Sequence, residues 1–268
     1  MIRKSRVLLS AALLLACACQ AERKPQSERK APPLESGSAL AGFVSNPKSG
    51  LPTLEVGSGP RVLVLLHGYG GSPNEWVPFA QKIRVAKNVR FVFPQAPEST
   101  GSGSAGGRAW WPLDLASLNR GEPLPDLSGS RPEGIDLSNQ KIRSLLRDLE
   151  TRLGSSEGPP ILGGYSQGAM ISADLAFTTD EPLKALVILS GTFVDEAGWT
   201  KGMVQRKGLR VFISHGSKDD VLQYGFAVRL RDAMKRAGLQ VTWVPFAGGH
   251  EVPAEVVTAL KTFLDDLD

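Results

Sequence analysis

From about residue 60 the chain contains short apolar runs, separated by longer stretches with a different spacing of apolar residues. The runs are rich in β-branched and aromatic side chains, and several are continuous rather than alternating, which predicts strands buried on both faces. Strands are expected at residues 62–66, 89–93, 161–163, 185–189, 210–214 and 241–244. Such strands are typical of a parallel sheet covered on both sides.

The stretches between these runs carry apolar residues at helical spacing. Helices are predicted at residues 76–86, 137–153, 167–177, 226–237 and 254–267. Strands that alternate with helices build the α/β class, a mainly parallel central sheet flanked by helices on both faces. Residues 99–134 break the pattern, because they are rich in Gly, Ser and Pro yet contain Trp110 and Trp111. We expect them to form an irregular insertion.

The first fifty residues have another character. Arg3, Lys4 and Arg6 precede an apolar run at 7–16 that is too short to cross a bilayer as a helix, a pattern typical of a secretion signal. Residues 20–50 are rich in Lys, Arg, Glu, Pro and Ser, a composition that cannot offset the entropy of ordering. Three parts are therefore predicted: a signal peptide at 1–16, a disordered tether at 17–50 and one folded domain at 51–268.

The two cysteines of the chain, Cys17 and Cys19, both lie in this N-terminal region. The signal ends in Leu-Leu-Ala-Cys at 14–17, which resembles the lipobox of bacterial lipoproteins, where the cysteine becomes the lipid-carrying first residue. We expect lipidation of Cys17 and a membrane-anchored protein, periplasmic or at the cell surface. A second frame at 16–19, and an ordinary signal peptide with incidental cysteines, are the alternatives. No disulfide can hold the folded domain together.

The formal net charge of +4 belongs to the N-terminal region rather than to the folded part. From residue 49 onward the chain carries about −1. A domain that binds nucleic acid by neutralising phosphates carries its excess Lys and Arg on the folded part. Nucleic acid is therefore not an expected partner.

The strongest chemical signal is Gly-Tyr-Ser-Gln-Gly at 164–168, between a predicted strand and a predicted helix. A serine at such a tight turn is pushed outward above the sheet, and Gly164 and Gly168 let neighbouring backbone pass closely. Ser166 then lies at a helix N-terminus, where backbone N–H groups favour negative charge. The pattern predicts Ser166 as a nucleophile and the N–H of Gln167 as an oxyanion donor.

A serine hydroxyl needs a base, and the chain contains three histidines. His250 follows the last predicted strand in a glycine-containing loop, which makes it the candidate base. The acid is expected in a loop after an intermediate strand, and residues 215–220, His-Gly-Ser-Lys-Asp-Asp, give the chain order Ser, Asp, His. Asp219 is the candidate acid. The residues alone leave its neighbour Asp220 open, and Asp195 is an alternative after the preceding strand.

The other two histidines, His67 and His215, each precede a glycine at a predicted strand end. Metal binding is one interpretation, but no third ligand at a recognisable spacing accompanies them, so structural hydrogen bonding is favoured. His67 opens a glycine-rich turn at 67–71 that can aim a second backbone N–H at an oxyanion, and we assign that N–H to Tyr69. Neither a metal nor an organic cofactor is expected.

Together these residues resemble the phospholipase/carboxylesterase family of α/β hydrolases, which includes acyl-protein thioesterases and small bacterial carboxylesterases. The resemblance covers about residues 60–268 and rests on LHGYGGSPNEW at 66–76, FPQAP at 93–97, GGRAWWPLD at 106–114, GYSQGAM at 164–170, LSG at 189–191, SHGSKDDVL at 214–222 and GGHEVP at 248–253. It implies the α/β-hydrolase fold. It assigns the nucleophile to Ser166, the acid to Asp219 and the base to His250, with the N–H groups of Tyr69 and Gln167 as the oxyanion hole.

The expected function is hydrolysis of a carboxylic ester of a small molecule or lipid through an acyl-enzyme, without a cofactor. Carboxylesterase, lysophospholipase and thioesterase substrates present the same carbonyl, and two departures from the family pattern, Gln223 and a long stretch at 119–134, bear on the choice. One alternative is a non-catalytic ligand-binding lipoprotein. Another is an esterase of aromatic or polysaccharide esters that stack on Trp110 and Trp111, although these rings would also serve simply to pin a loop.

Overall fold

The computed structural model describes residues 43–44, 46, 48–83, 89–101, 107–154 and 158–267. An eight-stranded sheet has the order β1-β2-β4-β3-β7-β8-β9-β10. Its strands are β1 (Phe43–Val44), β2 (Thr53–Val56), β3 (Arg61–Leu66), β4 (Val89–Pro94), β7 (Ile161–Tyr165), β8 (Ala185–Leu189), β9 (Arg210–Gly216) and β10 (Gln240–Phe246). From β4 to β10 neighbouring strands are parallel, whereas β1 and β2 add an antiparallel edge.

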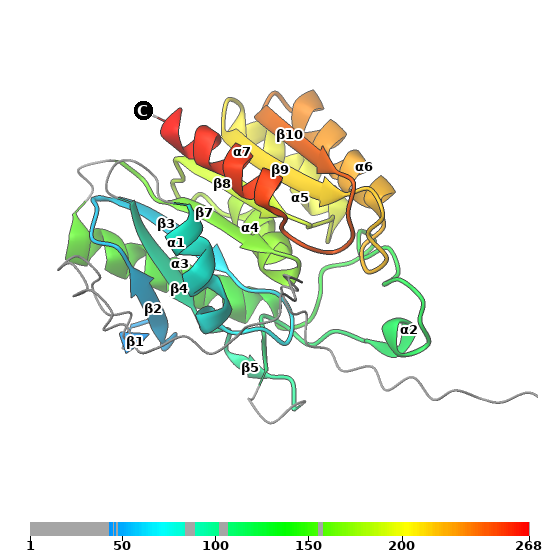
Figure 1. Cartoon of the computed structure of the whole chain (residues 1–268), viewed down its shortest axis with the longest axis horizontal. Coiled ribbons are helices and arrows are strands. Elements are labelled where there is room, and N and C mark those ends of the chain that lie inside the picture. The colour runs from blue at the N-terminus through cyan, green and yellow to red at the C-terminus, as the bar shows by residue number, and fades with distance from the viewer. Residues whose placement is uncertain are drawn as a thin grey trace, which may run out of the picture. The chain divides into compact units, whose positions relative to one another are not determined.

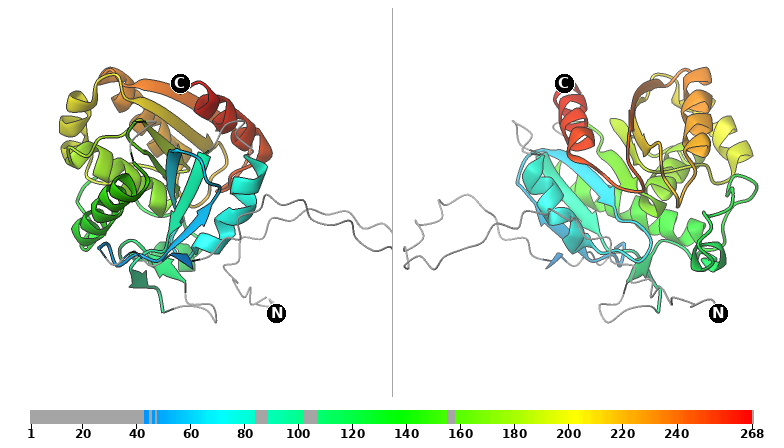
Figure 2. Two further views of the ribbon diagram at one scale, coloured as in Figure 1. Left: turned by 90° about the vertical axis from the view of Figure 1, so that its left-hand side faces the viewer. Right: turned by 45° about the vertical axis from the view of Figure 1, so that its right-hand side comes forward.

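Helices cover both faces of this sheet (Figures 1 and 2). On one face lie α3 (Ile135–Leu153), α4 (Gln167–Thr178), α5 (Glu196–Met203), which runs on into η2 (Val204–Arg206), and α6 (Tyr224–Arg236). On the other face lie the 3-10 helix η1 (Pro73–Trp76), α1 (Val77–Lys82) and α7 (Ala254–Asp265). The arrangement confirms the predicted α/β class with a mainly parallel sheet.

Two apolar cores lie between the sheet and its helical layers, and the strands supply both. Along β3, Val64 and Leu66 face the helices α3 to α6, whereas Leu63 and Leu65 face α1 and α7. Side chains alternate across a strand, so a strand covered on both sides needs apolar residues at every position. This requirement explains the continuous runs, and all six predicted strands are present with their ends within two residues.

The N-terminal edge begins earlier than predicted. The predicted signal peptide at 1–16, Cys17 and most of the predicted tether lie outside the described residues. Phe43–Val44, however, pairs with β2, and the side chain of Asn46 accepts a hydrogen bond from the Ser49 N–H at 3.1 Å and donates to Asp148 on α3 at 2.7 Å. The last residues of the segment predicted as a tether therefore belong to the fold, held by hydrogen bonds rather than by apolar burial.

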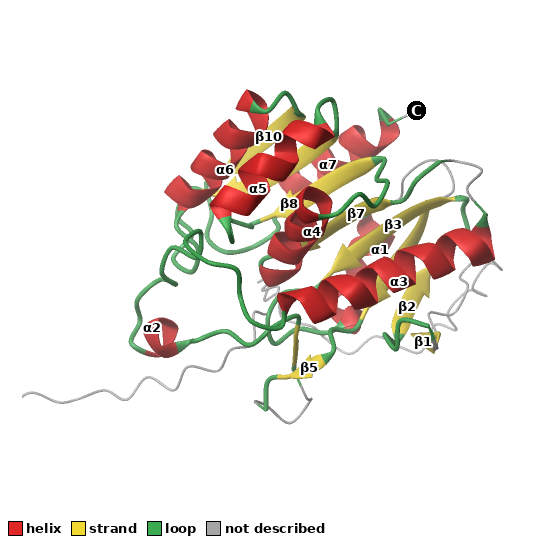
Figure 3. Ribbon diagram, turned by 180° about the vertical axis from the view of Figure 1, so that it is seen from behind, coloured by secondary structure: helices red, strands yellow, loops and turns green. Residues whose placement is uncertain are grey.

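The described part of the segment 99–134 contains little regular structure, and residues 102–106 lie outside the described part. Its regular parts are a small ribbon of β5 (Glu98–Ser99) and β6 (Arg108–Ala109) and one helical turn, α2 (Ala116–Asn119). The segment carries α2 away from the sheet and returns to α3 (Figure 3). On the way back the Leu124 N–H donates to the Val221 carbonyl at 2.9 Å.

Candidate active site

The backbone at Ser166 has an unusual conformation. Ser166 connects β7 to α4 with φ 53° and ψ −118°, a region that costs a non-glycine residue about 1–3 kcal/mol. Glycines make the turn sterically possible, because a Cβ on Gly164 would lie 2.2 Å from the Gly168 carbonyl carbon and one on Gly168 would lie 2.1 Å from the Leu66 carbonyl oxygen. The strand, turn and helix thus hold the Ser166 hydroxyl above the sheet, as the motif predicts.

Three loops at the carboxyl ends of the strands bring Ser166, His250 and Asp219 together. His250 Nε2 lies 2.9 Å from Ser166 Oγ, and His250 Nδ1 lies 2.7 Å from Asp219 Oδ2. Ser166 follows β7, Asp219 follows β9 and His250 follows β10. Carboxyl ends of parallel strands lie at one edge of a sheet, which is why residues 31 to 84 positions apart meet there.

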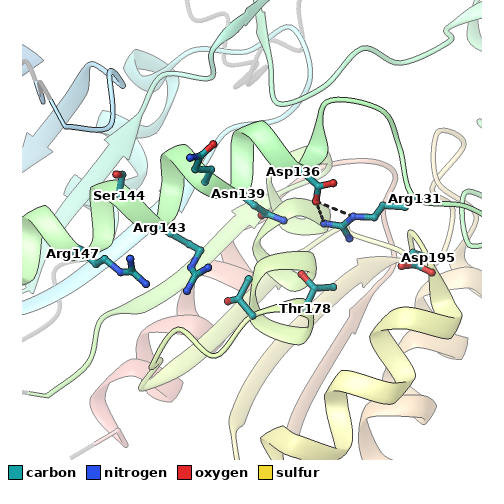
Figure 4. Close-up of a pocket in the computed structure, with 10 residues that line it drawn as sticks. Arg131, Asp136, Asn139, Arg143, Ser144, Arg147, Thr178 and Asp195 are labelled. Carbon is teal, nitrogen blue, oxygen red and sulfur yellow. Dashed lines mark hydrogen bonds and ion pairs between the residues drawn. The ribbon is translucent and has the colours of Figure 1, made fainter.

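Neither of the two alternative acids is hydrogen-bonded to His250. Asp220 is exposed, and Asp195 begins α5, where its side chain accepts a hydrogen bond from the Gly198 N–H at 3.1 Å. Asp195 also lines a pocket formed mainly by α3 and the end of α4 (Figure 4). Of the three aspartates weighed as the acid, Asp219 is therefore the one bonded to the His250 imidazole.

Asp219 is held as a carboxylate. Burial alone would raise its pKa, but hydrogen bonds from His215 and His250, the charge of His250 and the Leu222 N–H hold that pKa well below its usual range. Its Oδ1 accepts from the N–H groups of Val221 and Leu222 at 2.9 and 2.8 Å. The negative charge is therefore in place to balance an imidazolium at His250.

The predicted oxyanion donors belong to two segments that meet at the serine, since a Cβ on Gly68, next to Tyr69, would lie 3.4 Å from Ser166 Cβ. Gln167 is the first residue of α4, so the helix supplies no acceptor for its N–H. Tyr69 lies in a turn closed by the Gly71 N–H bonded to the Gly68 carbonyl at 3.1 Å, and Gly70 takes φ +74°. The Gly70 N–H donates to the Arg108 carbonyl at 2.8 Å, which ties this turn to β6.

The His67 ring holds this turn through two hydrogen bonds. Its Nε2 accepts from the Ala96 N–H at 3.1 Å, and its Nδ1 lies 2.7 Å from the Gly68 carbonyl, so Nδ1 carries the proton. Burial, opposed by the Gly68 bond and aided by the Arg108 charge, lowers the pKa of His67 to about 4. The predicted structural role fits these contacts, and the described residues include no group of three metal-ligating side chains.

Trp110 and Trp111 are both fully buried. Trp110 donates through Nε1 to the His67 carbonyl at 2.8 Å, and its backbone N–H donates to Gln167 Oε1 at 2.9 Å. Gln167 Nε2 in turn donates to the Trp111 carbonyl at 2.7 Å. These contacts favour the second interpretation of the tryptophans, that they attach the insertion to the domain next to the oxyanion turn.

Sequence reasoning missed two residues that support the site. The side chain of Gln167 bridges the elbow to the tryptophan segment, whereas only its backbone N–H was assigned a role. Tyr165 donates from its hydroxyl to the His250 carbonyl at 2.7 Å, and its ring centroid lies 5.0 Å from that of the imidazole. Both flank Ser166 in the motif, but the pattern G-x-S-x-G places no requirement on these two positions.

Comparisons with known proteins identify the family of this chain. Residues 58–267 match the family described as Phospholipase/Carboxylesterase. Acyl-protein thioesterase 1 of Mycosarcoma maydis is 31% identical over 221 residues, covering 74% of this chain and 82% of that protein. Acyl-protein thioesterase 1 of Yarrowia lipolytica is 28% identical over 214 residues, covering 76% and 90%.

Solved structures have the same fold. The crystal structure of esterase PE8 superimposes with a TM-score of 0.66 at 25% identity and covers 85% of this chain and 98% of its own. The carboxylesterase from Mesorhizobium loti gives a TM-score of 0.65 at 18% identity, with 84% and 98% covered. The family match includes β3 to β10, the serine elbow and both loops that carry Asp219 and His250. The chain belongs to the phospholipase/carboxylesterase family of α/β hydrolases.

Proposed function

We propose that the protein is a serine hydrolase that cleaves carboxylic esters through an acyl-enzyme, with Ser166 as nucleophile. The observation that carries this proposal is the continuous chain of hydrogen bonds from Ser166 Oγ through His250 to Asp219. A serine bonded to an imidazole that is oriented by a buried carboxylate is the arrangement that activates a hydroxyl.

In the first step, His250 Nε2 takes the hydroxyl proton while Ser166 Oγ bonds to the ester carbonyl carbon. The carbonyl oxygen becomes negative, and the N–H groups of Tyr69 and Gln167 donate to it. His250 then gives the proton to the leaving alcohol as the carbon–oxygen bond to that alcohol breaks. Asp219 keeps Nδ1 of the imidazole protonated and balances its positive charge.

In the second step, water releases the acyl group. His250 takes a proton from the water, whose oxygen attacks the acyl carbon of the Ser166 ester, and the same N–H groups stabilise the second oxyanion. The collapse of that intermediate returns the proton to Ser166 Oγ and frees the carboxylic acid. Every proton in this cycle moves between substrate, water and two side chains of this chain, so the proposal needs no cofactor.

Hydrolysis of p-nitrophenyl esters from two to sixteen carbons tests the proposal. Wild-type protein, Ser166→Ala and His250→Ala are compared with and without chelator, and the alanine variants are expected to lose at least about a thousandfold in kcat. Unchanged turnover in chelator is expected. Folded wild-type protein without turnover on any oxygen ester or acyl thioester would favour the ligand-binding alternative.

The substrate is proposed to be a small-molecule or lipid ester. The relatives named above as acyl-protein thioesterases support a thioester arm in the same assay. The alternative of aromatic or polysaccharide esters is weakened by the burial of Trp110 and Trp111, because a covered ring offers no open face for stacking. A preference for aryl acids over alkyl acids of equal size would restore it.

We further propose that the chain is a lipoprotein anchored through Cys17 and exported across the inner membrane. The support is the cationic start, the short apolar run and the Leu-Leu-Ala-Cys sequence at 14–17. Among the described residues, none of the helices is long and apolar enough to cross a membrane. Intact mass of the membrane fraction should show an acylated Cys17, and Cys17→Ser should release the protein from that fraction. An unmodified soluble chain would contradict the anchor.

A further inference from the structure

His215 lies at the end of β9, four residues before Asp219, and is fully buried. Its Nε2 lies 3.1 Å from Asp219 Oδ2 and 2.8 Å from the Leu222 carbonyl oxygen. Both neighbours are acceptors, so Nε2 carries the proton and donates to them. Nδ1 is buried and has no hydrogen-bond partner among the described residues, so a second proton there would be left without an acceptor.

The contact completes the coordination of the Asp219 carboxylate. Oδ1 accepts two backbone N–H groups, from Val221 and Leu222, and Oδ2 accepts from His250 Nδ1. Oδ2 is also the second acceptor, at 3.1 Å, of the His215 N–H that bonds to the Leu222 carbonyl. A carboxylate offers about four lone-pair positions, and all four are used. The side chain of Asp219 is completely buried, so water does not substitute for a missing donor.

We propose that His215 is a positioning residue of this hydrolase, which fixes Asp219 Oδ2 opposite His250 Nδ1 and shares its negative charge. His215 acts through Asp219 and does not touch the substrate. The inference rests on the proposed function, because it assigns His215 a part in the same reaction.

Sharing Oδ2 has a chemical consequence for the base. A carboxylate with one donor fewer attracts the His250 imidazolium more strongly, so His250 would keep its proton at a higher pH and release it less readily. The other titratable groups around His250 are Tyr165, whose ring packs on the imidazole, Glu251 next to it in the chain, and Lys218, whose N–H donates to the Gly248 carbonyl. These groups are the same in every variant below, so a shift reports on His215.

The test compares His215→Leu, which removes the donor with a side chain of similar volume, with His215→Gln, whose amide nitrogen is the same number of bonds from the backbone as Nε2. Tyr224→Phe is the control, because the Tyr224 ring packs against the His215 ring with a centroid distance of 6.2 Å but makes no hydrogen bond to Asp219. Each full-length variant is assayed on the best p-nitrophenyl ester across pH 5 to 9.

In His215→Leu we expect kcat to fall by about 10- to 100-fold, the factor that one hydrogen bond to a charged group is worth. KM should change by less than about twofold, and the acid limb of the kcat/KM profile should move to higher pH by about half a unit or more. His215→Gln should recover most of the rate, and Tyr224→Phe should match wild type. Equal losses in the Leu and Gln variants with an unmoved acid limb would assign His215 to packing alone and overturn the proposal.

A measurement on the wild-type protein keeps the inference testable if His215→Leu does not fold. Nitrogen-15 NMR of the histidine rings should show His215 protonated at Nε2 and unprotonated at Nδ1 at pH 7. In Asp219→Asn the Nε2 proton should stay bound, and its resonance should move out of the downfield region. The opposite tautomer would overturn the proposal. Because this readout needs no turnover, it separates failure of the positioning role from failure of the esterase function, which Ser166→Ala reports.

Discussion

The indole Nε1 of Trp110 donates to the His67 carbonyl oxygen at 2.8 Å, and this bond joins the insertion to the first residue of the oxyanion turn. The His67 ring in turn accepts a hydrogen bond from the N–H of Ala96, two residues after the end of β4. The turn that carries Tyr69 is thus held from the insertion side and from the sheet side. Its position depends on side chains that lie in a different part of the sequence.

Removing the Trp110 bond should slow the chemical step more than it weakens binding. Trp110→Phe keeps an aromatic ring but leaves the His67 carbonyl without its donor, so we expect kcat to fall by about two- to tenfold with KM nearly unchanged. Trp111→Phe is the matched control, because Trp111 Nε1 has no partner among the described residues. Equal rises of KM in both variants on aromatic esters would instead support stacking of the substrate.

Acid should destabilise the fold through His67. Its pKa in the folded state is lowered from 6.5 to about 4, so between these values the unfolded chain binds more protons and stability falls as the pH falls. The loss from this group amounts to about 3 kcal/mol between pH 6.5 and 4. Urea unfolding of wild type and His67→Asn at pH 7 and 4.5 checks this, since the variant should lose less. A pH dependence that stays the same in His67→Asn would contradict the assignment.

A second buried carboxylate, Asp174 on α4, should be a strong determinant of stability. It is fully buried and accepts from Arg131 at 2.5 Å, Asn139 at 2.5 Å and Trp199 at 2.7 Å. Asp174→Asn removes the buried negative charge that pairs with Arg131. We expect the free energy of unfolding in urea to fall by about 3–5 kcal/mol. Asp136→Asn is the control, because Asp136 also pairs with Arg131 but its side chain is 82% exposed, and it should change stability by less than about 1 kcal/mol.

Gly202 should not tolerate alanine. A Cβ there would lie 1.5 Å from the Phe177 carbonyl oxygen, where α5 crosses the end of α4, so Gly202→Ala must push the helices apart. We expect the free energy of unfolding to fall by at least about 2 kcal/mol, because overpacking that shifts the backbone is destabilising. Gly225→Ala in α6 meets nothing within 4 Å and should stabilise by about 0.5 kcal/mol. Equal melting temperatures for Gly202→Ala and Gly225→Ala would contradict this prediction, because they would show that α5 can shift away from α4 without loss of stability.

The parts of the fold that the sequence predicts are those whose pattern is set by burial on two faces. The helix α5 was missed because Gly198 and Gly202 lower its helix propensity, and it forms through packing of Trp199, which is fully buried. The edge strands β1 and β2 are too short to carry a periodic signal. In each case contacts with distant residues supply the stability that local preference does not.

The candidate site was predictable to a similar extent. Motif spacing placed Ser166 and His250, because a serine elbow and the loop after the last strand have fixed positions in this fold. Spacing could not separate Asp219 from Asp220, since both follow β9 in one loop, and the choice is made by which carboxylate turns toward the imidazole. The contact of His215 with Asp219 could not be predicted either, because it depends on how the loop folds back to bring Asp219 and the Leu222 carbonyl to the ring nitrogen Nε2.

The insertion is hydrogen-bonded to two loops of the site, the oxyanion turn and the loop that carries Asp219. At its start, the Arg108 carbonyl accepts from the Gly70 N–H of the oxyanion turn, and further along the Leu124 N–H donates to Val221 in the loop of the acid. The segment therefore connects the loop that is proposed to stabilise the oxyanion with the loop that orients the base. We therefore expect a change in the length of this segment to shift both loops and to alter the catalytic geometry, even though none of its residues takes part in the reaction.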